Sequence, residues 1–399
     1  MSHPQSYSGP AFLSYGFRPF FMAACLFAVV IIPLWMLIWT GGLTLQSVLM
    51  PVDWHSHEMI FGYGSAVIAG FLFTAVPNWT GGMPTRGRPL CAMLMLWLAG
   101  RLAVFGAVPL PWGIVVSIDS AFLLVLAVLV AREIISGKNW RNLMVLVPVS
   151  LLGLSNLFFF AESALVGQAV VSRRLGLGLV IFLVLLIGGR IIPSFTRNWL
   201  NQKGDRHLPK PFGKFDQLSL LATLPALVVW VIWPQTLSAA VLMCLAALLQ
   251  TVRLARWCGL STLRNPVLAM LHIAFLFAPV GMLANAAAAI GSLDASAGLH
   301  IWGIGAIGGM TVAVMMRATM GHTGRALVSG PVLNLAFIGL IPALLGRLFP
   351  HVEFPGGVTG LDLAALFWTL SFALLCWKLV PWLAMQRQDR KRPTPLRSR

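Results

Sequence analysis

Apolar runs of about twenty residues recur along the whole chain, and short polar segments rich in turn residues separate them. The runs lie near residues 18–40, 56–79, 89–107, 111–132, 142–165, 171–196, 215–233, 235–256, 265–290, 299–321, 328–349 and 358–384. A helix needs about 20 predominantly apolar residues to cross the hydrocarbon core of a bilayer. The pattern therefore predicts an all-α, polytopic membrane protein with about twelve transmembrane helices in a single domain, 18–384, flanked by the tails 1–17 and 385–399.

The composition excludes a soluble globular protein. Apolar residues make up 58% of the chain and charged residues only 10%, whereas a soluble domain carries about 25% charged residues. The net charge of +17 would indicate a nucleic-acid partner in a soluble protein. Here the basic residues lie between apolar runs and in the C-terminal tail, so we expect a lipid bilayer as the partner and no nucleic acid.

The distribution of Lys and Arg predicts the orientation in the membrane. One set of alternate loops carries Arg86, Arg88, Arg132, Lys138, Arg141, Arg197, Lys203, Arg206, Lys210, Lys214, Arg253, Arg256, Arg264, Arg317 and Arg325. The other set, near 41–55, 108–111, 166–170, 234–237, 292–299 and 350–357, carries none. Because positive charge favours the cytoplasmic side, both termini are predicted to be cytoplasmic. No basic segment or cleavage site precedes the first run, so we expect that run to remain in the mature protein.

A few identities recur at a spacing of 120 residues toward the cytoplasmic ends of the second helices of groups of four. They are Gly188-Gly189 with Gly308-Gly309, Arg197 with Arg317, and Asn78-Trp79 with Asn198-Trp199. This spacing predicts three pseudo-repeats of four helices in the same orientation. Chance matches between Gly-rich apolar segments would give the same few identities.

Five of the eight histidines are candidates for binding a cofactor or metal. His3, His207 and His351 lie in a tail and in loops, which leaves His55, His57, His272, His300 and His322. Imidazole is a common ligand of haem iron and copper, and an ionisable residue inside a membrane is a functional candidate by default.

His55 and His57 lie in the run 53–58 at the outer mouth of the second span, where Asp53 or Ser56 is expected to cap the helix. In a helix their rings point about 200° apart, so they cannot share a metal. We expect His57 to face the bundle, since at helical spacing it is followed by Phe61, Gly64 and Ile68. Small Gly64 would leave room for a flat macrocycle. The alternative is an interfacial histidine bonded to lipid headgroups or water.

His300 opens the tenth span at the outer surface and is followed by Gly303, Gly305, Gly308 and Gly309. We expect it at a similar depth to His57, so that the two imidazoles could ligate a haem across a glycine-lined gap. Close helix packing explains the same glycines. The matching dinucleotide-binding fingerprint is rejected, because that motif needs a strand before it.

His272 and His322 are the remaining metal candidates. His272 is predicted about 10 Å inside the ninth span, without an obvious partner. The alternative for His272 is a packed histidine bonded to a neighbouring backbone group or hydroxyl. His322 is 22 residues beyond His300, about 33 Å along a helix, so the two cannot share a metal. A simpler role for His322 is to help end the helix.

Charged residues inside the spans cluster toward the outer half. Burying single charges is costly, so we expect ion pairs with acids such as Glu58 and Asp119. Haem propionates would offer further partners for Arg101, Arg173, Arg174 and Arg347. Structural salt bridges would give the same sequence pattern.

Three stretches of the chain resemble the NnrS family of bacterial inner-membrane proteins. They are His55–Met59 continuing through Ala69–Gly81, Gly189–Thr196, and His300 through Met316–Arg325. The resemblance runs over most of the length. It implies a protein that contains haem b and copper and is associated with denitrification, the nitric-oxide response and protection from nitrosative stress. It leaves the ligands unassigned.

The chain is also similar to the haem-copper oxidases and nitric-oxide reductases, though more weakly. That resemblance implies twelve spans in three four-helix arcs, with haem ligands from spans two and ten, where His57 and His300 lie. In those enzymes the second metal site takes histidines from spans six and seven, and neither span carries one here. This departure argues against oxygen or nitric-oxide reduction by their mechanism.

The leading hypothesis is a membrane haem protein that binds or processes nitric oxide or nitrosylated iron, with His57 and His300 as iron ligands. A second hypothesis is a twelve-helix secondary transporter of a small solute. A third is an assembly factor that handles haem or copper, since five cysteines and seventeen methionines suit Cu(I), although Met is also ordinary membrane core. Whether the protein is an enzyme, and which electron donor it would use, stay open.

Overall fold

The computed structural model describes residues 7–388, and helices dominate this part of the chain. It contains twelve helical spans that are long and apolar enough to cross a membrane, which confirms the predicted number and fold class. The only strands in this range are the two-residue β1 (Glu353–Phe354) and β2 (Val358–Thr359). Parts of the two predicted tails, 1–6 and 389–399, lie outside the described residues.

Most spans are single helices, and the second, fifth, tenth and eleventh are composite. In chain order they are α1 (Phe17–Trp39); α2 (Pro51–His57), η2 (Glu58–Gly64) and α3 (Ser65–Thr80); α4 (Arg88–Phe105); α5 (Trp112–Ser136); η3 (Trp140–Asn142) and α6 (Leu143–Val166); α7 (Val171–Gln202); α8 (Lys214–Ile232); α9 (Leu237–Ala255); α10 (Pro266–Ala289); α11 (Ala295–His300), η5 (Ile301–Gly308) and α12 (Gly309–His322); α13 (Gly330–Ile338) and α14 (Leu340–Leu348); and α15 (Gly360–Ala384). The short helices η1 (Ala11–Leu13) and η4 (Gly259–Thr262) lie outside the spans.

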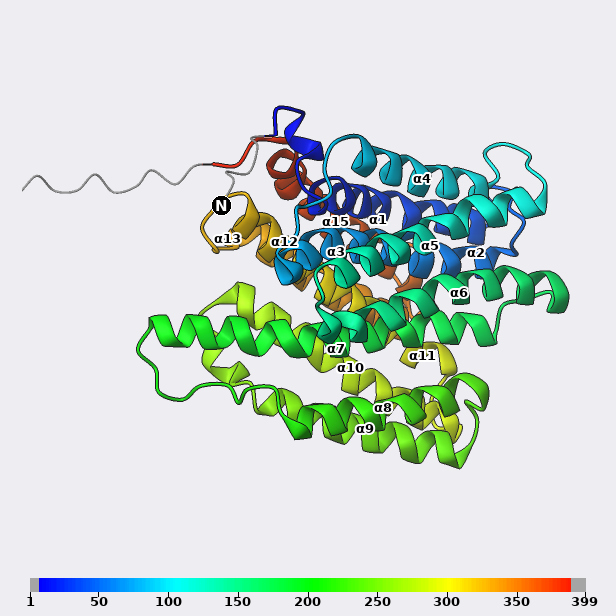
Figure 1. Cartoon of the computed structure of the whole chain (residues 1–399). Coiled ribbons are helices and arrows are strands. Elements are labelled where there is room, and N and C mark those ends of the chain that lie inside the picture. Colours follow the sequence, from blue (N-terminus) through cyan, green and yellow to red (C-terminus); the bar gives the residue numbers. More distant parts are fainter. Residues whose placement is uncertain (1–6, 389–399) are drawn as a thin grey trace, which may run out of the picture.

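The spans lie side by side, and the two ends of the bundle differ in charge. In Figure 1 the start of α1 and α13 lie at one end of the bundle and α2 lies at the other. Consecutive spans reverse direction, so the loops that carry Lys and Arg share the end at which α1 begins, which we name the basic end. The opposite end, whose loops carry no Lys or Arg, holds the starts of α2 and α11. At the centre α10 packs against α9, α7 and η5, and α1 packs against α15.

Spans two and ten share a feature that ordinary transmembrane helices lack. Each changes from an α-helix to a π-helix directly after a histidine: η2 follows His57, and η5 follows His300. Such wider turns occur frequently at functional sites. The corresponding span of the middle group, α7, is an uninterrupted α-helix. The threefold repeat therefore stays a prediction.

The second span begins five residues before the predicted start. Pro51 occupies its first turn, where a missing N–H costs nothing, and Met50 is the N-cap without a side-chain bond. The expectation that Asp53 or Ser56 caps this helix is therefore wrong. The Asp53 carboxylate instead accepts hydrogen bonds from the backbone N–H of Ala169 (2.8 Å) and the Ser163 hydroxyl (3.2 Å). Both His55 and His57 consequently lie inside the helix.

Candidate functional site

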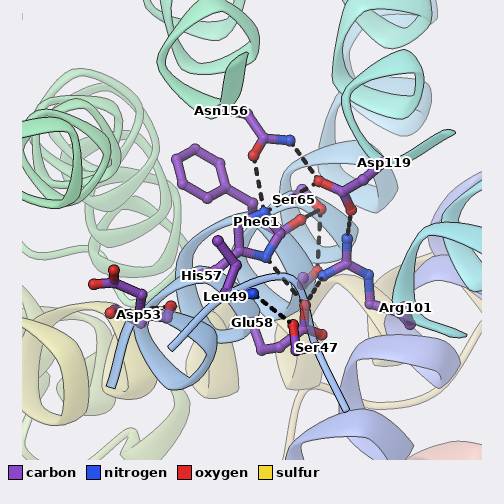
Figure 2. A network of polar contacts seen from close by, with 12 residues as sticks. Ser47, Leu49, Asp53, His57, Glu58, Phe61, Ser65, Arg101, Asp119 and Asn156 are labelled. Atoms are coloured by element: carbon purple, nitrogen blue, oxygen red, sulfur yellow. Dashed lines mark hydrogen bonds and ion pairs between the residues drawn. The ribbon is translucent and has the colours of Figure 1, made fainter. Parts of the chain in front are cut away.

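Five polar side chains from spans two to five form a closed network inside the bundle (Figure 2). His57 places Nδ1 3.1 Å from Glu58 Oε1, and places Nε2 2.9 Å from Asn156 Oδ1 and 3.1 Å from Asp119 Oδ2. The Arg101 guanidinium bonds Glu58 at 2.7 Å and also bonds Asp119. The Asn156 amide donates to Asp119 at 2.7 Å. Two acids thus face two groups that can carry positive charge, and the predicted intramembrane ion pairs are present.

The network occupies both ring nitrogens of His57. His57 is fully buried, as expected from its spacing, and its ring packs against Phe160 and Phe159 with centroids 4.9 and 5.4 Å apart. Both phenylalanines come from α6, so His57 faces spans four and five. Neither nitrogen is available to a metal while these hydrogen bonds hold. The Arg101 guanidinium uses Nη1 and Nη2 on the carboxylates of Glu58 and Asp119, so these two nitrogens are not available to a haem propionate.

His55 has the opposite environment, on the other side of the same helix. Its ring stacks on Trp35, with centroids 4.6 Å apart and planes 19° apart. Its Nδ1 is buried and has no hydrogen-bond partner among the described residues. His300, Arg347 and Arg173 are close enough to act on it electrostatically. His300 therefore lies within electrostatic range of His55, whereas the side chain of His57 belongs to a separate cluster.

The His300 ring is oriented by its own helix. Its Nδ1–H donates to the Ser296 carbonyl at 2.7 Å, which leaves Nε2 as the nitrogen with a lone pair. Asp294 caps this helix, and hydrogen bonds from Ser296 hold the pKa of the Asp294 carboxyl below its usual value. A fixed tautomer of this kind is typical of a histidine that binds a metal.

Arg173 and Arg347 place positive charge near His55 and His300. Arg347 acts electrostatically on both His55 and His300. Arg173 places Nη1 3.9 Å from Asp53 Oδ1, while its buried Nε has no hydrogen-bond partner in the described range. Arg174 differs, since its Nε donates to the Val231 carbonyl at 2.8 Å. Two guanidiniums beside two imidazoles favour an anionic ligand.

The glycines of span ten divide into two kinds. A side chain on Gly305 would overlap the Phe277 ring, which supports close packing as its role. A Cβ on Gly303, one turn beyond His300, would meet open space. Deeper in the bundle, Gly64 and Ile68 line an apolar cavity of about 70 Å³ together with Ile307, Met310 and Thr311 of span ten, among others. Pockets for cofactors measure about 300–1,000 Å³, so this cavity is too small for a cofactor and has the size for a small molecule.

The other two predicted metal candidates lie apart from this pair. His272 bonds Thr196 through Nε2 (2.9 Å), the hydroxyl partner of the alternative interpretation, although its Nδ1 is buried without a partner in the described chain. His322 ends α12 and packs against Phe17 and Tyr15 at the basic end, with centroids 5.3 and 6.1 Å away. Across residues 7–388, no group of three or more His, Cys, Asp and Glu side chains is arranged to hold a metal.

One residue of the network is missing from the sequence-based candidates. Asn156 lies in the middle of an apolar run. Its Oδ1 accepts from His57, and its amide nitrogen donates to Asp119. An amide inside a membrane span needs hydrogen-bond partners. An asparagine in the middle of an apolar run is therefore the one sequence signal that could have marked Asn156 as a member of the network.

The comparison with known families agrees with this architecture. The family model described as NnrS protein matches residues 11–387, which is nearly the whole chain. No curated protein sequence matches it. The chain therefore belongs to the NnrS family.

Proposed function

We propose that this protein is a membrane haem protein of the nitric-oxide and nitrosative-stress response, with the haem held between His55 of span two and His300 of span ten. The observation that carries the proposal is that His300 lies within electrostatic range of His55, at the end of the bundle opposite the basic end. His55 keeps a buried Nδ1 without a partner, and His300 uses only Nδ1 within its own helix. Family membership supports the same class of protein.

The surrounding residues fit a haem in charge and shape. The guanidiniums of Arg173 and Arg347 would offset the charge of the two propionates, a pairing that arginine makes well. The open space at Gly303 removes a steric obstacle beside His300. A bound haem supplies an iron centre that can bind nitric oxide or exchange electrons.

The remaining residues hold and orient the pair. Trp35 fixes the plane of the His55 ring by stacking, and the Ser296 carbonyl fixes the tautomer of His300. The buried network around His57 anchors the other side of α2 to spans three, four and five. His57 and Arg101 are therefore positioning residues in this proposal, and they do not touch the haem.

The proposed setting is the bacterial inner membrane with both termini in the cytoplasm, because Lys and Arg favour the cytoplasmic side. The histidine pair then lies at the periplasmic face, where an electron donor could reach it. The apolar cavity beside Gly64 and Met310 suits a small uncharged molecule such as nitric oxide that arrives through the lipid.

Absorption spectra of the purified full-length protein in detergent test the haem assignment. We expect a Soret band and extractable haem b in the wild type, and loss of both in His55→Ala and in His300→Ala. His272→Ala serves as the matched control and keeps the band. Addition of nitric oxide to the reduced protein is expected to shift it. A wild type without haem, or a band that survives in both variants, would rule out the assignment.

A further inference from the structure

A second cavity, of about 200 Å³, lies between α3 and α7 in the half of the bundle nearer the basic end. It is lined by Trp79, Ile187, Arg190, Ile191, Ser194 and Phe195. Trp79 comes from the last turn of α3, and the other five residues come from α7. The cavity, which we name the Arg190 cavity, therefore combines one cation and one hydroxyl with apolar and aromatic side chains.

Arg190 is the charged group of this cavity, and it has no acidic partner. Its Cζ lies 5.1 Å from the centroid of the Trp79 ring, and its Nη1 donates to Asn142 Oδ1 at 3.1 Å. Within residues 7–388 it forms no ion pair with a carboxylate. A guanidinium carries five N–H donors, so one bond to a neutral amide leaves most of them for a ligand.

A second arginine without an acidic partner lies against the wall of the Arg190 cavity. Arg317 of α12 places Cζ 3.6 Å from the centroid of the Phe195 ring. Its buried Nε has no hydrogen-bond partner in the described part of the chain, and it forms no ion pair there. Because Phe195 lines the cavity, Arg317 adds a second positive charge at its edge.

The Arg190 cavity lies at the depth where the lipid headgroups begin. Arg190 comes 19 residues after Val171, the first residue of α7, at the opposite end of the bundle. At a rise of 1.5 Å per residue this is about 29 Å, close to the hydrocarbon thickness of about 30 Å. Tryptophan is enriched at this boundary, as Trp79 is here. Arg190 is half-buried and Ser194 is exposed, so the cavity is accessible from outside the bundle.

From this arrangement we propose that the Arg190 cavity binds the phosphate group of an anionic phospholipid from the leaflet at the basic end. Arginine forms paired, charge-assisted hydrogen bonds with phosphate oxygens. Basic pockets between transmembrane helices are suited to anionic headgroups in the same way. The Ser194 hydroxyl offers one further donor.

The apolar surface beside the two arginines favours a lipid over a free phosphate ion. Ile187 and Ile191 line the Arg190 cavity and also the apolar cavity beside Gly64. A free ion would leave this surface in contact with water, whereas an acyl chain would cover it. The proposal does not depend on the haem proposal, because the histidine pair lies at the opposite end of the bundle.

Native mass spectrometry of the delipidated full-length protein in detergent tests the site. We expect the first phosphatidylglycerol to bind about tenfold more tightly than phosphatidylcholine, which has no net charge. Arg190→Gln should weaken phosphatidylglycerol binding by about tenfold, because it removes charge-assisted hydrogen bonds. Arg317→Gln should weaken it by about fivefold, the contribution of one basic residue near the membrane surface.

A variant that fills the cavity separates its shape from its charge. Ser194→Phe leaves both arginines in place and occupies the space of the headgroup, so it should abolish the preference for phosphatidylglycerol. Ser194 is exposed, so this variant tests the cavity even if Arg190→Gln is unstable. An unchanged preference in Ser194→Phe would overturn the proposal.

Two controls address net charge and the source of the phosphate. Arg206→Gln removes an exposed charge from a loop at the same end and should bind phosphatidylglycerol like the wild type. Equal losses in Arg206→Gln and Arg190→Gln, or equal affinity of the wild type for the two lipids, would overturn the proposal. Inorganic phosphate added in excess should leave phosphatidylglycerol bound. Displacement of the lipid would instead assign the cavity to a soluble anion and would overturn the lipid as its occupant.

Discussion

His55 and His57 lie two residues apart on one short helix, yet their surroundings are opposite. Both ring nitrogens of His57 are within 3.1 Å of oxygen acceptors. His55 has a buried nitrogen with no hydrogen-bond partner in the described chain, and cations surround it. Buried polar groups are nearly always hydrogen-bonded, so an exception asks for an explanation. The comparison separates a histidine whose hydrogen bonds are all made, and which holds the structure, from one that is free for the ligand role that we propose.

The two regions also differ in their charge balance. In the His57 network the charges of Glu58 and Asp119 offset those of Arg101 and His57. Beside His55, Arg173 has one acidic neighbour at 3.9 Å, and Arg347 has Asp294, which is exposed. A balanced cluster needs no ligand, whereas a positively charged one inside a membrane gains from an anion.

The largest expected effect is the difference in the free energy of unfolding between Arg101→Met and Arg347→Met. Arg101→Met leaves Glu58 and Asp119 buried without their shared cation, and breaking a buried pair in this way costs about 3–5 kcal/mol. Arg347→Met removes a half-buried charge and should change the free energy of unfolding by less than about 0.5 kcal/mol. Denaturant unfolding of both variants in detergent, without haem, measures the difference. Equal losses of stability would contradict the assignment of separate roles. In haem-loaded protein the order should reverse, with Arg347→Met losing haem more readily.

A smaller contrast is expected for the two histidines. His57→Leu removes hydrogen bonds to two buried carboxylates and should lower the free energy of unfolding by about 3 kcal/mol. His55→Leu replaces a ring that only stacks on Trp35 and should cost about 1 kcal/mol or less. The measurement requires haem-free protein, because a bound ligand adds stability by mass action. A larger cost at position 55 would show that its ring is structural.

The sequence predicts the number and class of the spans because run length reports directly on bilayer thickness. It also predicts that His55 and His57 point apart, since helical geometry alone requires this. It does not predict which ring faces which partner. That depends on where α5, α6 and α11 pack, and Asp119, Asn156 and His300 are distant from the helix in sequence.

Other features are invisible to a local pattern for the same reason. The glycines 303 and 305 look alike in the sequence, and only the position of Phe277 separates a close-packed site from an open one. Pro51 shifts the start of span two because it is a better first-turn residue than the polar pattern indicates.

The smallest expected effect is the difference between substitutions at Gly303 and Gly305, which compares an open and a close-packed position within span ten. Gly305→Ala forces a methyl group against the Phe277 ring and should cost about 1 kcal/mol, at the low end of overpacking, because an aromatic ring can shift slightly. Gly303→Ala enters open space and should leave stability unchanged or raise it slightly, since Ala is the better helix former. Thermal unfolding of haem-free protein measures both. A larger side chain sharpens the contrast: Gly303→Leu should fold normally yet retain less haem than Gly303→Ala, because it fills the space beside His300. If Gly303→Leu keeps full haem occupancy, that space does not belong to the haem site, and the macrocycle must approach His300 from another side.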